Sequence, residues 1–228
     1  MKSMARHELS GVVNVINRHV AITLAIAVAS TTLVAKLWES VRERDGIVRF
    51  DQNATRWLVT RRTDGVVSLM RFVTRLADIR VVSIVIVSTT VWLLVRRLHR
   101  AAVFVVVSSV GTAILVAGMK LAAGRSRPPV GAAVVAAGNS FPSGHAAQSI
   151  ACYGSIAIVV WVLTSSRTTR TVAVAAAVFL ALTIGASRLV LGVHWVSDVL
   201  AGWAVAVGWI AVTMVALGWG PSAPPQRG

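Results

Sequence analysis

The chain has 228 residues and a mass of 24.1 kDa, and its mean hydropathy of +0.74 excludes an ordinary soluble domain of this length. Its formal net charge of +15 would suggest a nucleic-acid partner in a soluble protein, but here the basic residues lie between long apolar runs. We therefore expect anionic lipid headgroups or a phosphorylated substrate as partners, and no nucleic acid.

Six apolar runs predict an all-α, polytopic membrane protein built as one six-helix transmembrane bundle, because each run approaches the roughly 20 residues that cross a membrane. The runs cover residues 20–37, 79–95, 101–119, 146–163, 171–186 and 199–217. We expect 1–19 to be a cytoplasmic N-terminal segment, 20–218 the transmembrane domain, and 219–228 a disordered tail. The first run has a second interpretation as a signal peptide, because Ala27 and Ala29 resemble a cleavage site.

The segment 38–78 is long and mixed in character, and we expect it to form an extracytoplasmic loop. Its second half, DGVVSLMRFVTRLAD, places Arg71 and Arg75 away from one apolar helical face. That face consists of Val66, Leu69, Met70, Val73 and Leu76. The pattern predicts a short amphipathic helix in the membrane interface, which serves either as a rim over a lipid site or as a passive connector.

The orientation of the bundle follows from the short basic turn RRLHR at 96–100, between the second and third runs. The positive-inside rule places this turn, and with it the N-terminus, in the cytoplasm. The basic segment 38–78 opposes this orientation, but long loops count little in the rule.

Three polar clusters interrupt the apolar pattern. KLAAGRSRP ends the third run, FPSGH begins the fourth, and SRLVLGVHWVSD joins the fifth run to the sixth. Counting membrane crossings brings all three clusters to one face of the membrane. With the N-terminus inside, that face is extracytoplasmic.

The clusters supply groups that bind phosphate. Lys120, Arg127 and Arg188 bring three cations to one face, and the planar fork of arginine matches phosphate oxygens. Ser143 and Gly144 precede a helix start, where free backbone N–H groups and the helix dipole bind anions. Each residue alone has an ordinary interpretation as an interfacial anchor or a helix cap, so their conjunction carries the hypothesis.

The clusters also supply reactive groups. His194 and Asp198 are four residues apart, so on a helix they share a face. Asp198 would then accept a hydrogen bond from one ring nitrogen and leave the other free to attack phosphorus. His145, beside the anion-binding turn, could protonate a leaving oxygen. Together these residues predict phosphoryl transfer without a metal.

At these residues the sequence closely resembles the type 2 phosphatidic acid phosphatase superfamily, which includes the lipid phosphate phosphatases. Soluble vanadium haloperoxidases share the site of this family. Its signature is K-x6-R-P, P-S-G-H and S-R-x5-H-x3-D. Here the signature is filled by Lys120, Arg127, Pro128, Pro142, Ser143, Gly144, His145, Ser187, Arg188, His194 and Asp198. By motif, the resemblance covers residues 120–198.

The resemblance implies that His194 becomes a phosphohistidine, that Asp198 orients it, and that His145 protonates the leaving group. It implies that the phosphate is held by Lys120, Arg127, Ser143, Gly144 and Arg188. It further implies that no metal or cofactor takes part, and that the site faces the extracytoplasmic side of the cell membrane.

The expected function is hydrolysis of a lipid phosphate or diphosphate with release of inorganic phosphate. Candidate substrates are polyprenyl diphosphate, phosphatidylglycerol phosphate and phosphatidic acid. A phosphotransferase with a lipid or sugar hydroxyl as acceptor, and a non-catalytic lipid-phosphate binder or transporter, are the alternatives. The expected partners are the substrate and membrane lipids, with no obligate protein partner.

Some residues fall outside the signature. Arg125 lies close to Arg127 and is a candidate contact for a diphosphate. His7, His19 and His99 match no motif. Cys152 is the only cysteine, and we expect it to be a small buried residue.

Overall fold

The computed structural model describes residues 2–129 and 131–219, with side chains described from residue 18 onward. Within these ranges the chain is helical and contains no strand. The elements are α1 (Lys2–Glu43), α2 (Gly46–Arg61), α3 (Asp64–Arg75), α4 (Ile79–Val95), α5 (His99–Ala123), α6 (Gly144–Ser149), η1 (Ile150–Gly154), α7 (Ser155–Leu163), α8 (Arg167–Val190) and α9 (Val196–Ala216).

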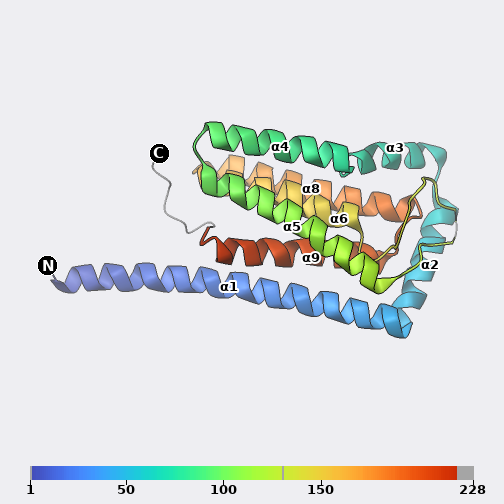
Figure 1. The fold of residues 1–228 in the computed structure, drawn as a ribbon, viewed down its shortest axis with the longest axis horizontal. Helices are drawn as coiled ribbons and strands as arrows, with labels where there is room; N and C mark the ends of the chain where they lie inside the picture. The colour runs from blue at the N-terminus through green and yellow to red at the C-terminus, as the bar shows by residue number, and fades with distance from the viewer. Residues whose placement is uncertain (1, 130, 220–228) are drawn as a thin grey trace.

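Six segments of the described chain are long and apolar enough to cross a membrane. They are Arg18–Glu43, Asp64–Val95, His99–Ala123, Gly144–Leu163, Arg167–Val190 and Val196–Ala216. The fourth segment joins α6, η1 and α7 into one helix with a wider π-helical turn. The long helices run side by side (Figure 1), which confirms the predicted six-helix bundle of a multi-pass membrane protein.

Helix α9 lies at the centre of the bundle. About half of its apolar window is buried, compared with 11% for the segment that joins α3 and α4. Its tryptophans pack where neighbouring helices carry glycine. A Cβ atom on Gly111 of α5 would lie 2.1 Å from Trp209, and one on Gly185 of α8 would lie 2.2 Å from Trp203. Glycine is therefore needed for this close approach.

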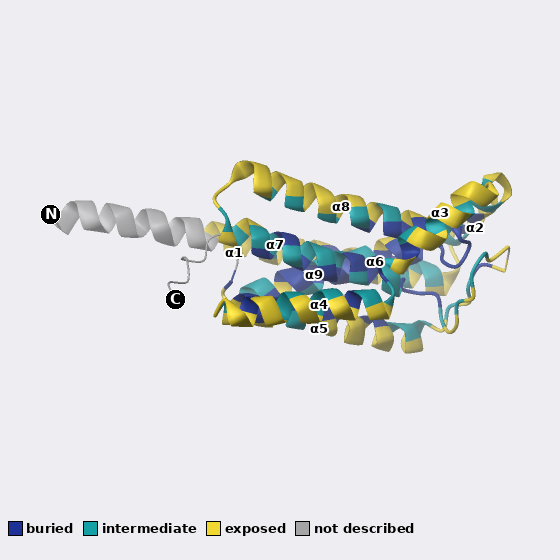
Figure 2. Cartoon of the chain, turned by 90° about the horizontal axis from the view of Figure 1, so that it is seen from above, coloured by how far each residue is buried: buried dark blue, intermediate teal, exposed yellow. Residues whose placement is uncertain are grey.

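The outer surfaces of the long helices are apolar and exposed. Figure 2 shows exposed positions along the outer sides of α4, α5 and α8. They include large side chains such as Ile84, Val91, Ile114 and Phe179. In a chain of this hydropathy such surfaces face lipid.

Helix α1 is longer than predicted and packs along α9. Ala27, Ser30 and Leu37 are buried, and a Cβ atom on Gly208 of α9 would lie 3.1 Å from Ser30. The residues predicted as a separate segment, 1–19, continue this helix from Lys2 onward.

The prediction of a disordered tail over residues 219–228 is wrong at its first residue, Trp219. Trp219 is buried, and its ring packs against Phe104 of α5 with 4.6 Å between the ring centroids. Apolar packing therefore extends past the end of α9. Residues 220–228 lie outside the described residues.

The segment 38–78 differs most from the prediction. It contains a helix that was not predicted, α2, which runs across one end of the bundle (Figure 1). The amphipathic helix expected in its second half is present as α3, but α3 continues roughly in the direction of α4 instead of lying across the end. Together α3 and α4 are longer than a hydrocarbon core of ~30 Å requires, so part of α3 extends beyond the core.

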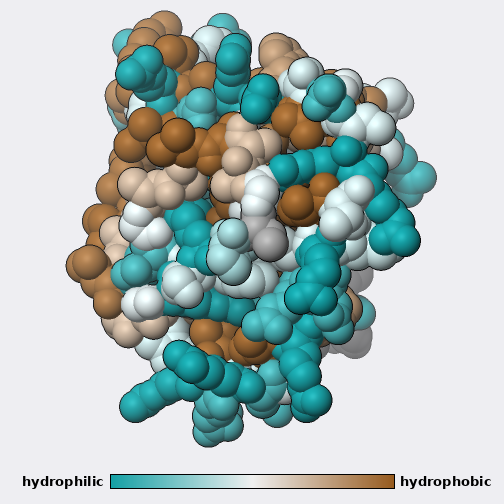
Figure 3. Space-filling model, turned by 90° about the vertical axis from the view of Figure 1, so that its right-hand side faces the viewer, coloured by the Kyte–Doolittle hydropathy of each residue, from teal (hydrophilic) through white to brown (hydrophobic). Residues whose placement is uncertain are grey.

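We call the end of the bundle that α2 covers the site end. Helices α1, α5 and α8 finish there, and α6 and α9 begin there. Hydrophilic side chains are spread across this end (Figure 3). All three polar clusters of the sequence therefore meet at one end of the bundle, as the crossing count predicted.

Candidate active site

His194 lies in the short connection between α8 and α9 and is almost fully buried. Its Nδ1 atom is 3.3 Å from Asp198 Oδ2, and its Nε2 atom is 3.2 Å from Arg127 Nη1. Asp198 belongs to the first turn of α9, where its Oδ2 atom also accepts a hydrogen bond from the Trp195 backbone N–H. With Asp198 as acceptor, the Nδ1 atom carries the proton and Nε2 keeps its lone pair.

Burial, together with the charges of Arg188 and Arg127, lowers the pKa of His194 to about 4 despite the opposing effect of Asp198. His194 is therefore neutral at physiological pH, the form in which Nε2 is a nucleophile. Burial also lowers the pKa of Arg127, while the charge of Asp198 opposes that shift. Arg127 nonetheless stays positive near neutrality.

Asp198 is held from its other side by a buried ionic network. Its Oδ1 atom accepts a hydrogen bond from Arg125 Nη1 at 2.6 Å. Arg125 Nη2 also donates to Asp51 of α2 at 2.8 Å, and Asp51 accepts from the backbone N–H and the hydroxyl of Ser197. Asp51 and Asp198 are fully buried, and the Arg125 side chain is only 9% exposed. Arg125 is thus committed to two carboxylates, which does not fit its predicted contact with a diphosphate.

The turn before α6 forms a candidate anion site. Ser143 is the N-cap of α6, and its backbone N–H donates to the Asp198 carbonyl at 2.9 Å. Gly144 is the first residue of α6, where backbone N–H groups are free to bind an anion. The turn lies directly against α9, because a Cβ atom on Gly202 would be only 2.5 Å from the Ser143 carbonyl oxygen.

Arg188 lies in the last turn of α8 and is 5% exposed. Its Nη1 atom donates to the Thr74 hydroxyl of α3 at 2.6 Å, while its buried Nε atom has no partner. Among the described residues no carboxylate lies within ion-pair distance of it. A buried cation without a counter-charge is costly, so this guanidinium is suited to an anionic ligand.

The remaining cations of the site are Lys120 and Arg127. Both are held by carbonyl oxygens of the segment between α5 and α6. Lys120 Nζ donates to the Asn139 carbonyl at 2.6 Å, and the Asn139 side chain donates back to the Lys120 carbonyl. Arg127 donates to carbonyl oxygens of Ala137 and Gly138, which fixes its guanidinium within the same segment.

Helices α2 and α3 brace this segment from outside. Arg71 of α3 donates to the Ala133 carbonyl at 2.8 Å, and Arg62 after α2 donates to the Gly131 and Val190 carbonyls. Of the two interpretations that the sequence left for the helix at 64–78, these contacts favour the rim.

His145, in the first turn of α6, is paired with a residue that the sequence analysis missed. Its Nε2 atom is 3.0 Å from Asp78 Oδ1, and both side chains are partly exposed. Asp78 precedes α4 as its N-cap but makes no capping bond, so its carboxylate is free to orient His145. Arg127 and Arg188 both lie within electrostatic range of His145, as they do of His194. The two histidines therefore share one cationic site.

An apolar groove leads to this site between α4 and α5. It encloses about 590 Å³ and has no charged residue along its lining except at one end. Its walls include Ile79, Val82, Ile86, Val110, Ala113, Ile114 and Ala117, and it ends at Lys120, Gly144 and His145. The groove therefore joins the lipid-facing surface to the reactive groups.

The structure brings all eight predicted site residues to the site end. Asp51, Asp78 and Arg125 were not predicted to hold the reactive side chains. The chain has only eight acidic residues, so each carboxylate on the predicted site face was a signal that could have been followed. Among the described side chains no three His, Cys, Asp or Glu residues gather in a way that could hold a metal ion.

The comparisons agree with this geometry. A family model described as "PAP2 superfamily" matches residues 101–220, more than half of the chain. The chain belongs to the PAP2 superfamily, the type 2 phosphatidic acid phosphatases that its signature resembles. No match was found among curated proteins.

Two solved structures show the same fold. The first transmembrane PAP2 type phosphatidylglycerolphosphate phosphatase from Bacillus subtilis is similar with a TM-score of 0.75 and 20% identity, over 83% of this chain and 94% of that chain. LpxE from Aquifex aeolicus is similar with a TM-score of 0.58 and 18% identity, over 73% of this chain and 95% of that chain. The protein thus has the fold of a PAP2 membrane phosphatase, and both the family and the neighbours support a phosphatase.

Proposed function

We propose that this protein is a metal-independent lipid phosphate phosphatase that forms a phosphohistidine on His194 and releases inorganic phosphate. The observation that carries the proposal is the buried Arg188, which lacks a counter-charge in the same cationic site as Arg127 and both histidines. A phosphate group supplies that counter-charge and places phosphorus beside His194.

A lipid substrate is supported by the groove between α4 and α5. Its apolar walls suit a hydrocarbon chain, and its polar end carries Lys120, Gly144 and His145. A phosphate at that end would keep its chain in the groove and its charge among the cations. The B. subtilis neighbour, by its name, acts on phosphatidylglycerolphosphate, which makes that compound a first candidate here beside phosphatidic acid and polyprenyl diphosphate.

In the first step, His194 Nε2 attacks phosphorus and the bond from phosphorus to the lipid oxygen breaks. His145, in its protonated form beside Asp78, donates a proton to that oxygen and becomes neutral, so the lipid leaves as an alcohol, or as a monophosphate if the substrate is a diphosphate. Arg127 Nη1, which now faces Nε2 at 3.2 Å, would turn its N–H to a phosphate oxygen. Lys120, Arg188 and the Gly144 N–H stabilise the negative charge that builds up on those oxygens.

In the second step, a water molecule attacks the phosphohistidine and His145 accepts its proton. The bond between phosphorus and Nε2 breaks, His194 becomes neutral again, and inorganic phosphate leaves. Asp198 keeps the Nδ1 proton in place throughout, so the same ring nitrogen is regenerated as the nucleophile.

The test is the variant His194→Ala, purified in detergent and assayed for phosphate release from a panel of lipid phosphates with a chelator present. Turnover should fall at least about a thousandfold, because the nucleophile is lost. Wild-type protein quenched and kept at alkaline pH, where a phosphohistidine is stable, should carry phosphate on His194. Full activity of His194→Ala, or activity that the chelator abolishes in wild type, would refute this mechanism.

The matched control is His99→Ala, which removes a histidine at the opposite end of the bundle. It should turn over like wild type. Adding an alcohol acceptor separates hydrolysis from phosphotransfer, because only a transferase gives the phosphorylated alcohol as its main product.

A further inference from the structure

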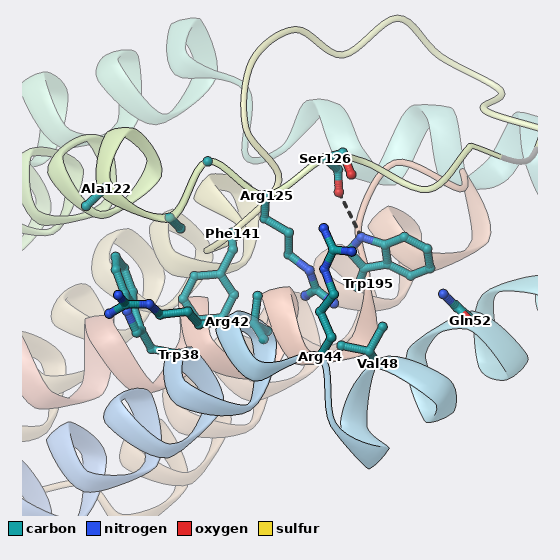
Figure 4. A pocket seen from close by; sticks show the side chains of 13 residues that line it. Trp38, Arg42, Arg44, Val48, Gln52, Ala122, Arg125, Ser126, Phe141 and Trp195 are labelled. Carbon is teal, nitrogen blue, oxygen red and sulfur yellow. Dashed lines mark hydrogen bonds between the residues drawn. The ribbon is translucent and has the colours of Figure 1, made fainter.

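A second cavity lies at the site end, on the other side of the chain segment that follows α5. It encloses about 690 Å³ between the C-terminal end of α1, the start of α2 and the residues after α5 (Figure 4). None of the eight predicted site residues lines it. Arg125 and Trp195 lie between this cavity and the reactive groups, because Arg125 lines the cavity and also binds Asp198.

The cavity is strongly positive. Three arginines line it, Arg42, Arg44 and Arg125, and no acidic residue does. The buried carboxylates Asp51 and Asp198 neutralise Arg125. Among the described residues, neither Arg42 nor Arg44 has a carboxylate within ion-pair distance. Two exposed arginines without an ion pair therefore lie at the mouth of the cavity, where their N–H groups are free to bind an anion with oxygen acceptors.

Arg44 has a backbone conformation that is unusual for an arginine. Arg44 follows α1 with φ of 57°, the left-handed conformation that favours glycine at a helix end. An arginine in this position costs conformational energy, and its side chain is directed into the cavity wall (Figure 4).

The remaining walls suit a lipid better than a free ion. Trp38, Phe141 and Trp195 supply aromatic surface, and Val41, Val48 and Ala122 supply aliphatic surface. The cavity lies at the ends of α1 and α5, the level at which tryptophan and phospholipid headgroups meet in membranes. We propose that this cavity binds the phosphate group of an anionic phospholipid through Arg42 and Arg44, at a site separate from the catalytic one.

The test is native mass spectrometry of the purified protein in detergent, titrated with phosphatidylglycerol. Wild type should retain one molecule of this lipid, and the double variant Arg42→Gln/Arg44→Gln should bind it at least about tenfold more weakly. The control Arg49→Gln/Arg56→Gln removes two exposed arginines of α2 that do not line the cavity, and it should bind like wild type. Elution on gel filtration reports whether each variant is folded.

Three further arms identify the ligand and the site. Phosphatidylcholine should be retained less than phosphatidylglycerol, and inorganic phosphate at equal concentration should not displace the lipid. The variant Lys120→Gln, altered in the catalytic group, should retain the lipid. Equal binding by Arg42→Gln/Arg44→Gln, displacement by phosphate, equal binding of phosphatidylcholine, or loss in Lys120→Gln would each overturn the proposal. Because no arm measures turnover, the result is independent of the proposed function.

Discussion

Single carboxylates decide how the reactive side chains are held. Asp198 orients His194, and it is itself fixed by Arg125, which Asp51 holds in turn. Asp51 comes from α2, more than a hundred residues before the histidine. It touches no reactive atom, and we therefore regard it as a positioning residue for Asp198.

Asp51→Asn should lower kcat about 10-fold to 100-fold with little change in KM, because the amide keeps the shape of the side chain but loses the ion pair with Arg125. Steady-state kinetics in detergent separate the two constants. Asp51→Glu, which restores the charge, should recover part of the loss. The control is Asp45→Asn, which changes the exposed N-cap of α2 outside the ionic network. It should leave kcat and KM unchanged. A similar loss in both asparagine variants would mean that Asp51 only stabilises α2.

The residues that bind phosphate or react with it could be predicted from the sequence, but the carboxylates that hold them in position could not. Lys120, Arg127, His145, Arg188, His194 and Asp198 stand out because ionisable groups are costly beside a membrane. Asp51 and Asp78 are noticeable only as scarce carboxylates on the predicted site face, and each lies in a mixed segment that equally allows a solvated carboxylate. Only the fold shows that Asp51 is buried and that Asp78 meets His145.

Helices were predictable where lipid contact makes them apolar throughout. The run 79–95 matches α4, four other runs fall within longer helical segments, and the run 199–217 begins inside α9 and ends one residue after it. The extra turns carry Lys120, His145, Arg188 and Asp198, so the apolar pattern ends just where the site begins. Helix α2 was missed because the residues that it buries, Asp51 and Thr55, are polar. Hydrophobic periodicity detects a helix only when its buried face is apolar.

The contact between α6 and α9 sets the position of the anion-binding turn. Gly202→Ala should push this turn outward, because the new Cβ atom would overlap the Ser143 carbonyl. We expect a loss of about 1–3 kcal/mol in stability and a marked fall in kcat. Thermal unfolding and phosphate release measure the two effects. Gly118→Ala, on a surface of α5 with nothing within 4 Å, is the control. Identical behaviour of the two variants would show that the contact is not tight.

At the scale of the whole molecule, the N-terminus-in orientation predicts an extracytoplasmic site end. Single cysteines can be introduced into the wild-type chain for labelling, because its one native cysteine, Cys152, is buried and should not react. In intact cells, a membrane-impermeant maleimide should label Asn53→Cys on α2, and it should label Ser165→Cys between α7 and α8 only after permeabilisation. The reverse pattern would place the site in the cytoplasm.

The walls of the groove between α4 and α5 include Ile79 and Ile114, which are exposed on the apolar outer surface, so we expect the groove to open sideways into the bilayer. If its occupant is the substrate chain, encounters occur by diffusion in two dimensions. Turnover would then follow the mole fraction of substrate among the surrounding lipids, so diluting a proteoliposome suspension with buffer would leave the rate per enzyme unchanged, while adding inert lipid to the same vesicles would slow it.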